Sequence, residues 1–224
     1  MKVKPSLLVS SMSGRHSGGV LSKNDGGRIG KKPSNPQSAD QQNVRALFAQ
    51  LSRAWALLSD SQRNGWNSGA ANFPFSDAYG QKKILKGKAL FNKLNMNIIL
   101  AGGTQIDNCP APASVEAPES VSFATLSSSA ISIGWTGGAV AADTAFVVEC
   151  SPQLSVGYSI APKSKFRVVD VLPAADTTPT AITTPYTAKF GALVTGNKVF
   201  ARVYAVNLLT GQTSPYLNIS GTIV

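Results

Sequence analysis

Apolar residues recur at helical spacing between residues 38 and 101. Ser38 and Ser59 each precede a glutamine by three residues, which is the pattern of a capping box at a helix start. After the first box, apolar positions three and four apart share one helix face: Val44, Leu47, Phe48, Leu51, Trp55 and Leu58. A third stripe runs over 86–100 and ends at Gly102-Gly103, where a helix commonly stops. The pattern predicts three short helices, broken by a loop at 72–77. Their core is so small that we expect it to need either a partner or the neighbouring domain.

From residue 112 onward the apolar pattern changes to a period of two, which is typical of strands. Ile131, Ile133 and Trp135, for example, alternate with Ser132 and Gly134, so the apolar side chains share one face. Turn residues separate the candidate strands, which are 121–124, 130–136, 144–151, 166–172, 186–190, 198–207 and 217–224. Their number and spacing predict a seven-stranded antiparallel β-sandwich.

The predicted strand 198–207 carries a candidate interface. One face is apolar and would lie on the core, and it consists of Val199, Ala201, Val203 and Ala205. The opposite face consists of Phe200, Arg202, Tyr204 and Val206. Aromatic residues and arginine are enriched at protein–protein interfaces, so Phe200, Arg202 and Tyr204 are candidate contact residues. The alternative is a strand face that a neighbouring loop or the helical unit covers.

The first 36 residues have no helical periodicity and are rich in glycine. Asn24 to Gly27 is a hairpin turn signal, flanked by Val20-Leu21 and by Arg28-Ile29. A hairpin alone is marginal in water, so this segment needs a neighbour to order it. We therefore expect residues 1–36 to form an extended arm, free or docked on another subunit.

The net positive charge of the chain lies entirely in its first half. The 224 residues carry a formal net charge of +10, and residues 1–108 hold 15 Lys and Arg against 5 Asp and Glu. Residues 109–224 hold six of each and are neutral. Such asymmetry indicates parts with different roles. We predict an α+β chain in three parts: the basic arm 1–36, a helical docking unit 37–108 and the sandwich 109–224.

Basic residues in the arm and the helical unit are candidate partner or phosphate contacts: Arg28, Lys31, Lys32, Lys82, Lys83, Lys86, Lys88 and Lys93. They would bind nucleic acid or an acidic protein surface. The alternative is a solvated helix face. Arginines and exposed aromatic residues favour nucleic-acid readout, but none is interleaved with the lysines between 82 and 93.

The composition argues against an enzyme. One histidine and two cysteines leave few options for nucleophilic catalysis, and neither a phosphate-binding loop nor a metal-ligand spacing is visible. We predict no catalytic, cofactor-binding or metal-binding residues. No apolar run approaches the ~18 residues of a membrane span. The apolar run Leu7–Val9 is too short for a signal peptide, and Pro5 precedes it.

The second half resembles a fibronectin type III domain at two places. The second strand of that family ends in a core tryptophan, as Ile131–Trp135 does here. A late segment runs from Leu193 and Gly196 into Arg202–Asn207, with the sequence Arg-Val-Tyr-Ala-Val-Asn. One departure is Val199, where the family usually has a tyrosine whose hydroxyl forms a hydrogen bond at a corner of the sandwich. The resemblance implies a binding or spacer module and names no ligand.

The first half resembles poorly characterised proteins of tailed phages and prophages, several of which carry an immunoglobulin-like C-terminal domain. The similarity rests on Pro33–Pro36 after the glycine-rich arm and on spaced residues further along: Gln41, Gln42, Arg45, Trp55, Leu58, Gln62, Arg63, Trp66, Gly80, Gly87, Leu90, Phe91 and Asn95. It implies a structural protein of the virion, assembled in the host cytoplasm. Its partners would be other virion proteins and further copies of itself. Two alternatives remain open: a basic protein associated with nucleic acid, and a virion-surface adhesin that binds a glycan or a cell-surface protein.

Overall fold

The computed structural model describes the backbone of three strands in the arm, and then residues 37–76, 80–136, 140–174 and 176–224 in full. The chain forms two compact units, Met1–Leu90 and Phe91–Val224. Each unit is described by itself.

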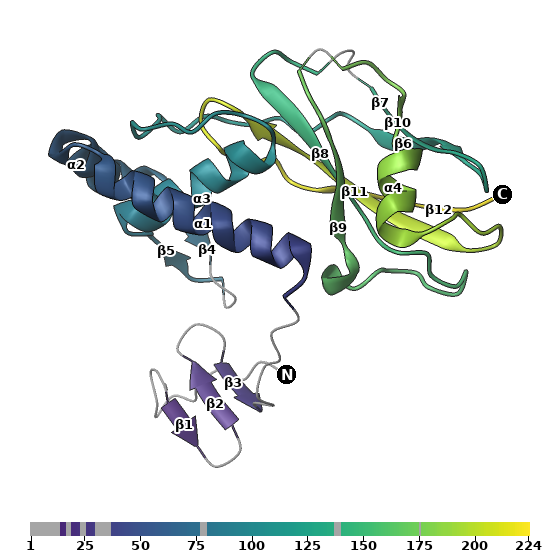
Figure 1. The fold of residues 1–224 in the computed structure, drawn as a ribbon, viewed down its shortest axis with the longest axis horizontal. Helices are drawn as coiled ribbons and strands as arrows, with labels where there is room; N and C mark the ends of the chain where they lie inside the picture. Colours follow the sequence, from purple (N-terminus) through teal and green to yellow (C-terminus); the bar gives the residue numbers. More distant parts are fainter. Residues whose placement is uncertain are drawn as a thin grey trace. The chain divides into compact units, whose positions relative to one another are not determined.

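The arm contains the predicted hairpin. Strands β1 (Gly14–His16), β2 (Gly19–Ser22) and β3 (Gly26–Ile29) form an antiparallel sheet, drawn in purple in Figure 1. Val20 lies opposite Arg28, and Gly26 and Gly27 of the predicted turn belong to β3 instead. The candidate contact residues Lys31 and Lys32 lie outside the described residues, and so does the side chain of Arg28.

The first two helices begin and end as the sequence predicts. Helix α1 spans Ala39–Leu57, and the Ser38 hydroxyl at its N-cap accepts a hydrogen bond from the Gln41 amide. Helix α2 spans Asp60–Gly69, and Ser59 and Gln62 complete a reciprocal capping box. The buried apolar residues of this unit are few: Leu51, Leu58, Trp66, Ala70 and Leu90. In place of the predicted loop at 72–77, the chain has a 3-10 turn (Ala70–Asn72) and strand β4 (Phe75–Ser76), which pairs with β5 (Lys82–Lys83).

Helix α3 spans Gly87–Leu100, and the two compact units meet within it. It ends in a Schellman motif, because Gly102 has a φ of 82° and the Gly103 amide bonds to the Ile98 carbonyl at 2.8 Å. Asn95, which is fully buried, bonds through its side chain to the backbone of Ile106. The last turns of α3 therefore belong with the chain that follows, although the sequence places the boundary at the Pro-rich segment near residue 109.

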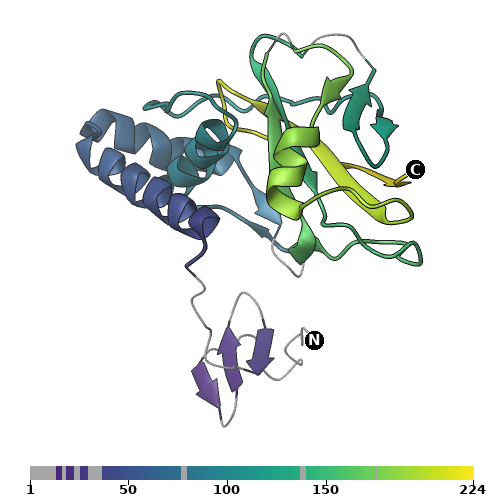
Figure 2. The same cartoon turned by 45° about the vertical axis from the view of Figure 1, so that its right-hand side comes forward.

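Two antiparallel sheets enclose the core of the second unit, and Figures 1 and 2 show them as separate layers. One sheet has the order β10-β7-β6 and the other β12-β11-β8-β9. The strands are β6 (Val121–Leu126), β7 (Ile131–Trp135), β8 (Thr144–Cys150), β9 (Arg167–Leu172), β10 (Thr180–Ala181), β11 (Lys198–Asn207) and β12 (Leu217–Thr222). All but β10 are confirmed to within two residues of the predicted bounds.

The predicted strand 186–190 is wrong. This segment belongs to helix α4 (Thr183–Phe190), and the two-residue strand β10 precedes it. The signals for a helix are present, because Pro185 stands in the first turn, where its missing amide proton costs no bond. Gly191 follows the last turn with a φ of 85°. The apolar residues Tyr186 and Phe190 fit the helical spacing of four as well as the strand spacing of two, and they contact each other with ring centroids 5.0 Å apart.

Trp135 is a core residue, as predicted, and its ring lies edge-on to that of Phe146 at 5.7 Å. Val199 is buried and offers no hydroxyl. The corner before β11 is held instead by Gln153, which donates to the Ala192 carbonyl at 2.7 Å and accepts from the Val194 amide at 2.8 Å.

Candidate functional site at the β12 margin of the sandwich

A cluster of aromatic and charged side chains covers the outer face of the four-stranded sheet. The Arg202 guanidinium lies 4.3 Å from the ring centroid of Phe166 and 4.7 Å from that of Tyr216. It also forms an ion pair with Glu149, the residue opposite it on β8. The Tyr204 ring packs edge-on against Tyr216 at 4.8 Å. Two of the three candidate interface residues, Arg202 and Tyr204, are therefore brought together with partners from three other segments.

The remaining residues of this face are less accessible than the sequence suggests. Phe200 is 6% exposed and Lys198 lies over its ring, with Nζ 5.1 Å from the centroid. Val206 is 1% exposed and packs with Ala101, at the end of α3. Burial, and next the negative charge of Glu149, raise the pKa of Tyr204.

A groove of about 420 Å³ opens beside this cluster on the outer face. Apolar side chains dominate its walls, with the Lys163 and Arg202 cations at its margin. Its lining includes Ile160, Ala161, Phe166, Phe200, Asn218 and Ser220. Ile160 is 78% exposed, so the groove presents an apolar surface to its surroundings.

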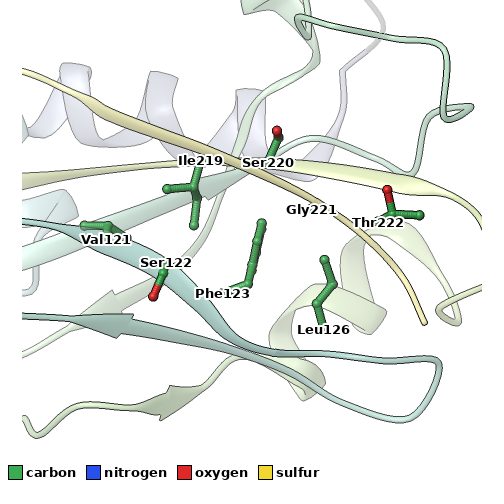
Figure 3. A pocket seen from close by; sticks show the side chains of 8 residues that line it. All are labelled: Val121, Ser122, Phe123, Leu126, Ile219, Ser220, Gly221 and Thr222. Atoms are coloured by element: carbon green, nitrogen blue, oxygen red, sulfur yellow. The ribbon is translucent and has the colours of Figure 1, made fainter.

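A second hollow, of about 530 Å³, lies between β6 and β12, where the two sheets meet at one side of the sandwich. Figure 3 shows Phe123 and Leu126 from β6 and Ile219 from β12 pointing into the same space. Gly221 forms part of this wall, and a Cβ added there would lie 2.6 Å from Leu126 Cδ2. The two hollows therefore flank one strand, β12, and Ile219 and Ser220 line both of them.

The candidate basic residues occupy several elements. Lys82 and Lys83 form β5, Lys86 precedes α3, and Lys88 and Lys93 lie within α3. Lys83 is half-buried and the other four are exposed. Lys88 and Lys93 are five residues apart, which places them roughly 140° apart around the helix. Within α3 they therefore do not share a face.

Glu149, Phe166 and Tyr216 were not predicted as site residues. Glu149 lies opposite Arg202 in the β8–β11 register, and opposite charges on paired strands are a recognisable signal once that register is known. Phe166 is the first residue of the predicted strand 166–172, but in the structure it precedes β9. Tyr216 precedes β12 and lies outside the predicted strands.

Across the described ranges, no group of three or more His, Cys, Asp or Glu side chains is placed to hold a metal ion. Within the same ranges, no helix is both long and apolar enough to cross a membrane.

Comparison with known proteins finds matches among solved structures. No protein-family model matches the chain, and no curated protein matches it. Among solved structures, it is similar to the solution structure of the fn3 domain of human collagen alpha-1(XX) chain, at 14% identity and a TM-score of 0.32. That similarity covers 51% of this chain and 89% of the collagen domain.

Proposed function

We propose that this chain is a structural component of a tailed-phage particle, in the head, neck or tail. It docks through its arm and helical unit and presents a sandwich of the fibronectin III or immunoglobulin type. The resemblance of residues 14–110 to phage and prophage proteins supports the phage assignment. The observation that carries the docking role is the uncovered first half of α1.

Among the described residues, none covers the first two turns of α1. Residues 37–46 are all exposed, and the apolar residues Val44 and Phe48 are 46% and 52% exposed on the same helix face. Most of the stability of a helix in a protein comes from packing of its apolar face. Val44 and Phe48 belong to the same apolar stripe as Leu51 and Leu58, which are buried further along the chain. A helix with this uncovered stripe is suited to docking on another protein.

The partners in this proposal are other virion proteins and further copies of the chain, and the particle assembles in the host cytoplasm. A second candidate is binding to nucleic acid, favoured by the exposed side chains of Lys82, Lys86 and Lys88. Phosphate contacts of this kind would weaken steeply as salt rises, whereas apolar docking would not. A third, adhesin role would use the outer-face groove beside Phe166.

The docking role is tested by charging the exposed stripe. We compare the full chain with its Val44→Asp/Phe48→Asp variant for incorporation into particles, by mass spectrometry of purified virions produced with each form. The proposal expects the variant to fold, to be soluble and to be lost from particles. The matched control is Gln50→Asp, an exposed position of the same helix outside the apolar stripe, which should be incorporated normally. Normal incorporation of the double variant would overturn the docking role.

A further inference from the structure

The edges of the two sheets differ in how they are protected against pairing with another strand. Natural sheets protect edges with bulges, charges, proline or very short strands. Strand β6 has a bulge between Phe123 and Thr125. The pairing of β8 with β9 is also irregular, β9 carries Arg167 and Asp170, and Lys189 bonds to the Val168 carbonyl. Strand β10 has two residues and follows Pro179.

Strand β12 has none of these protections. Its six residues pair with β11 without a register shift, and they include no charge and no proline. Its backbone groups alternate in direction. Ile223 bonds to Gly196 and Asn197 on the β11 side, whereas Val224 bonds outward to Leu126 and Ser128. By this alternation, Asn218, Ser220 and Thr222 direct their N–H and C=O groups away from β11. Among the described residues, no strand pairs with that edge.

We propose that β12 accepts an added antiparallel strand, and that this strand is the N-terminal segment around Ser6–Ser10 of a second copy of the chain. Strand addition of this kind takes affinity from main-chain hydrogen bonds and specificity from pockets for alternate side chains. Both are present at β12, since it offers three outward residues and has a hollow on each side.

The sequence of the N-terminal segment fits this edge. The segment lies outside the described residues, so its sequence alone is used. Val3, Pro5, Leu7 and Val9 are apolar at every second position, and the residues between them are polar except for Leu8. From Pro5 to Ser11 the segment carries no charge, as β12 carries none. This period of two matches a strand with one face on a core.

The antiparallel pairing that aligns Leu8 with Ser220 places an apolar side chain at each of the two hollows. Ser6 and Ser10 then lie opposite Thr222 and Asn218, and these residues exchange the outward main-chain bonds of β12. Leu7 and Val9 fall on the inner face, beside Gly221 and Ile219, where the 530 Å³ hollow is open.

Leu8 falls on the outer face at Ser220, which lines the 420 Å³ groove. Pro5 has the same parity as Leu7, so its missing N–H points away from β12 and costs no bond in an antiparallel pair. A parallel pair would need that N–H, which is why we assign the antiparallel direction.

This inference rests on the proposed function for its biological setting and names the surface and partner strand of assembly. The two fail differently. If the Val44→Asp/Phe48→Asp variant is lost from particles but the N-terminal segment does not pair with β12 of a second copy in solution, the virion role is retained and the strand addition is wrong.

The test uses two full-length variants with complementary defects. Leu7→Asp/Val9→Asp removes the donor strand and leaves the β12 edge intact. Ser220→Pro removes an outward N–H and keeps the bonds between β12 and β11, so it blocks only the acceptor. Ser220→Ala keeps the backbone N–H and is the matched control. Mass in solution is measured by sedimentation for each protein and for an equimolar mixture of the two defective variants.

We expect the unmodified chain and Ser220→Ala to form the same oligomer, and each defective variant to be a monomer. The mixture should form a heterodimer, because one variant supplies an intact segment and the other an intact edge. That recovery also shows that Leu7→Asp/Val9→Asp keeps a folded β12 edge. Chemical denaturation of Ser220→Pro, followed by tryptophan fluorescence, shows separately whether that variant is folded. A monomeric unmodified chain, an oligomer that survives Leu7→Asp/Val9→Asp, or a mixture that stays monomeric would each overturn the proposal. If the oligomer survives Leu7→Asp/Val9→Asp but Ser220→Pro is a monomer, the β12 strands of two copies pair with each other instead.

Discussion

Asn97 donates a hydrogen bond of 2.8 Å from its side-chain amide to the carbonyl of Gly211, which lies 114 residues further along the chain. The bond joins the last turns of α3 to the turn between β11 and β12. Gly211 approaches the helix so closely that a Cβ added to it would lie 2.4 Å from the Leu94 carbonyl oxygen. The end of α3 is therefore part of the structural unit that contains the sandwich.

Gly211→Ala should destabilise the second unit strongly. The residue has a φ of 71°, which disfavours a side chain, and the new methyl group would clash with helix backbone that cannot move aside. We expect a loss of about 2 kcal/mol or more in the free energy of unfolding. Chemical denaturation followed by tryptophan fluorescence measures it. The control is Gly157→Ala, where nothing lies within 4 Å of the added Cβ. Equal stability of the two variants would contradict the close approach.

Local patterns predicted most of the elements, and the failures have physical reasons. Helices α1 and α2 follow from serine caps and a stripe of period near 3.6, both of which are local signals. The segment Tyr186–Phe190 carries two apolar residues four apart, a spacing that both a helix and a strand allow. We predicted a strand, but the segment is helical. Pro185 and Gly191 are the residues that would have decided for a helix.

The candidate site was predicted only in part, because it depends on strand register. Arg202 was recognisable from its strand, but Glu149 becomes its partner only when β8 and β11 pair with these residues opposite each other. The hollow between β6 and β12 is lined by residues about 95 positions apart, such as Phe123 and Ile219. No local pattern contains that proximity.

The Arg202–Glu149 ion pair should couple two distant strands energetically. Their side chains are 16% and 13% exposed, so removal of one partner leaves a largely desolvated charge. We expect Glu149→Gln to cost about 2 kcal/mol, and a double-mutant cycle with Arg202→Met to show a coupling of at least about 1 kcal/mol. The exposed pair Asp60–Arg63 is the control and should couple by less than about 0.5 kcal/mol. A coupling at Arg202 as small as the control would contradict this role.

Stability should fall as pH rises above about 9. Burial, and next the charge of Glu149, raise the pKa of the Cys150 thiol from 9.0 to about 12. The folded protein therefore binds a proton that the unfolded chain releases between these values, so unfolding is favoured there by up to about 1.4 kcal/mol per pH unit. The pKa of Tyr186 is also raised, chiefly by burial, and adds to the loss above pH 10.

Denaturation curves at pH 8, 9, 10 and 11 measure this effect, and the Cys150→Ala variant supplies its control. The variant lacks the thiol, so its stability should fall less steeply over the same range, even though the substitution itself lowers stability at pH 8. Parallel pH dependence of the two proteins would mean that the thiol does not cause the loss.

We propose that this chain assembles with other protein chains. The most direct measurement is the mass of the purified full-length protein in solution at low and at high salt, with and without added DNA. We predict a defined oligomer whose mass is unchanged by DNA and retained at high salt, because apolar and main-chain contacts hold it together. A protein that is monomeric in every condition, or that gains mass only on DNA and loses it as salt rises, would contradict the account.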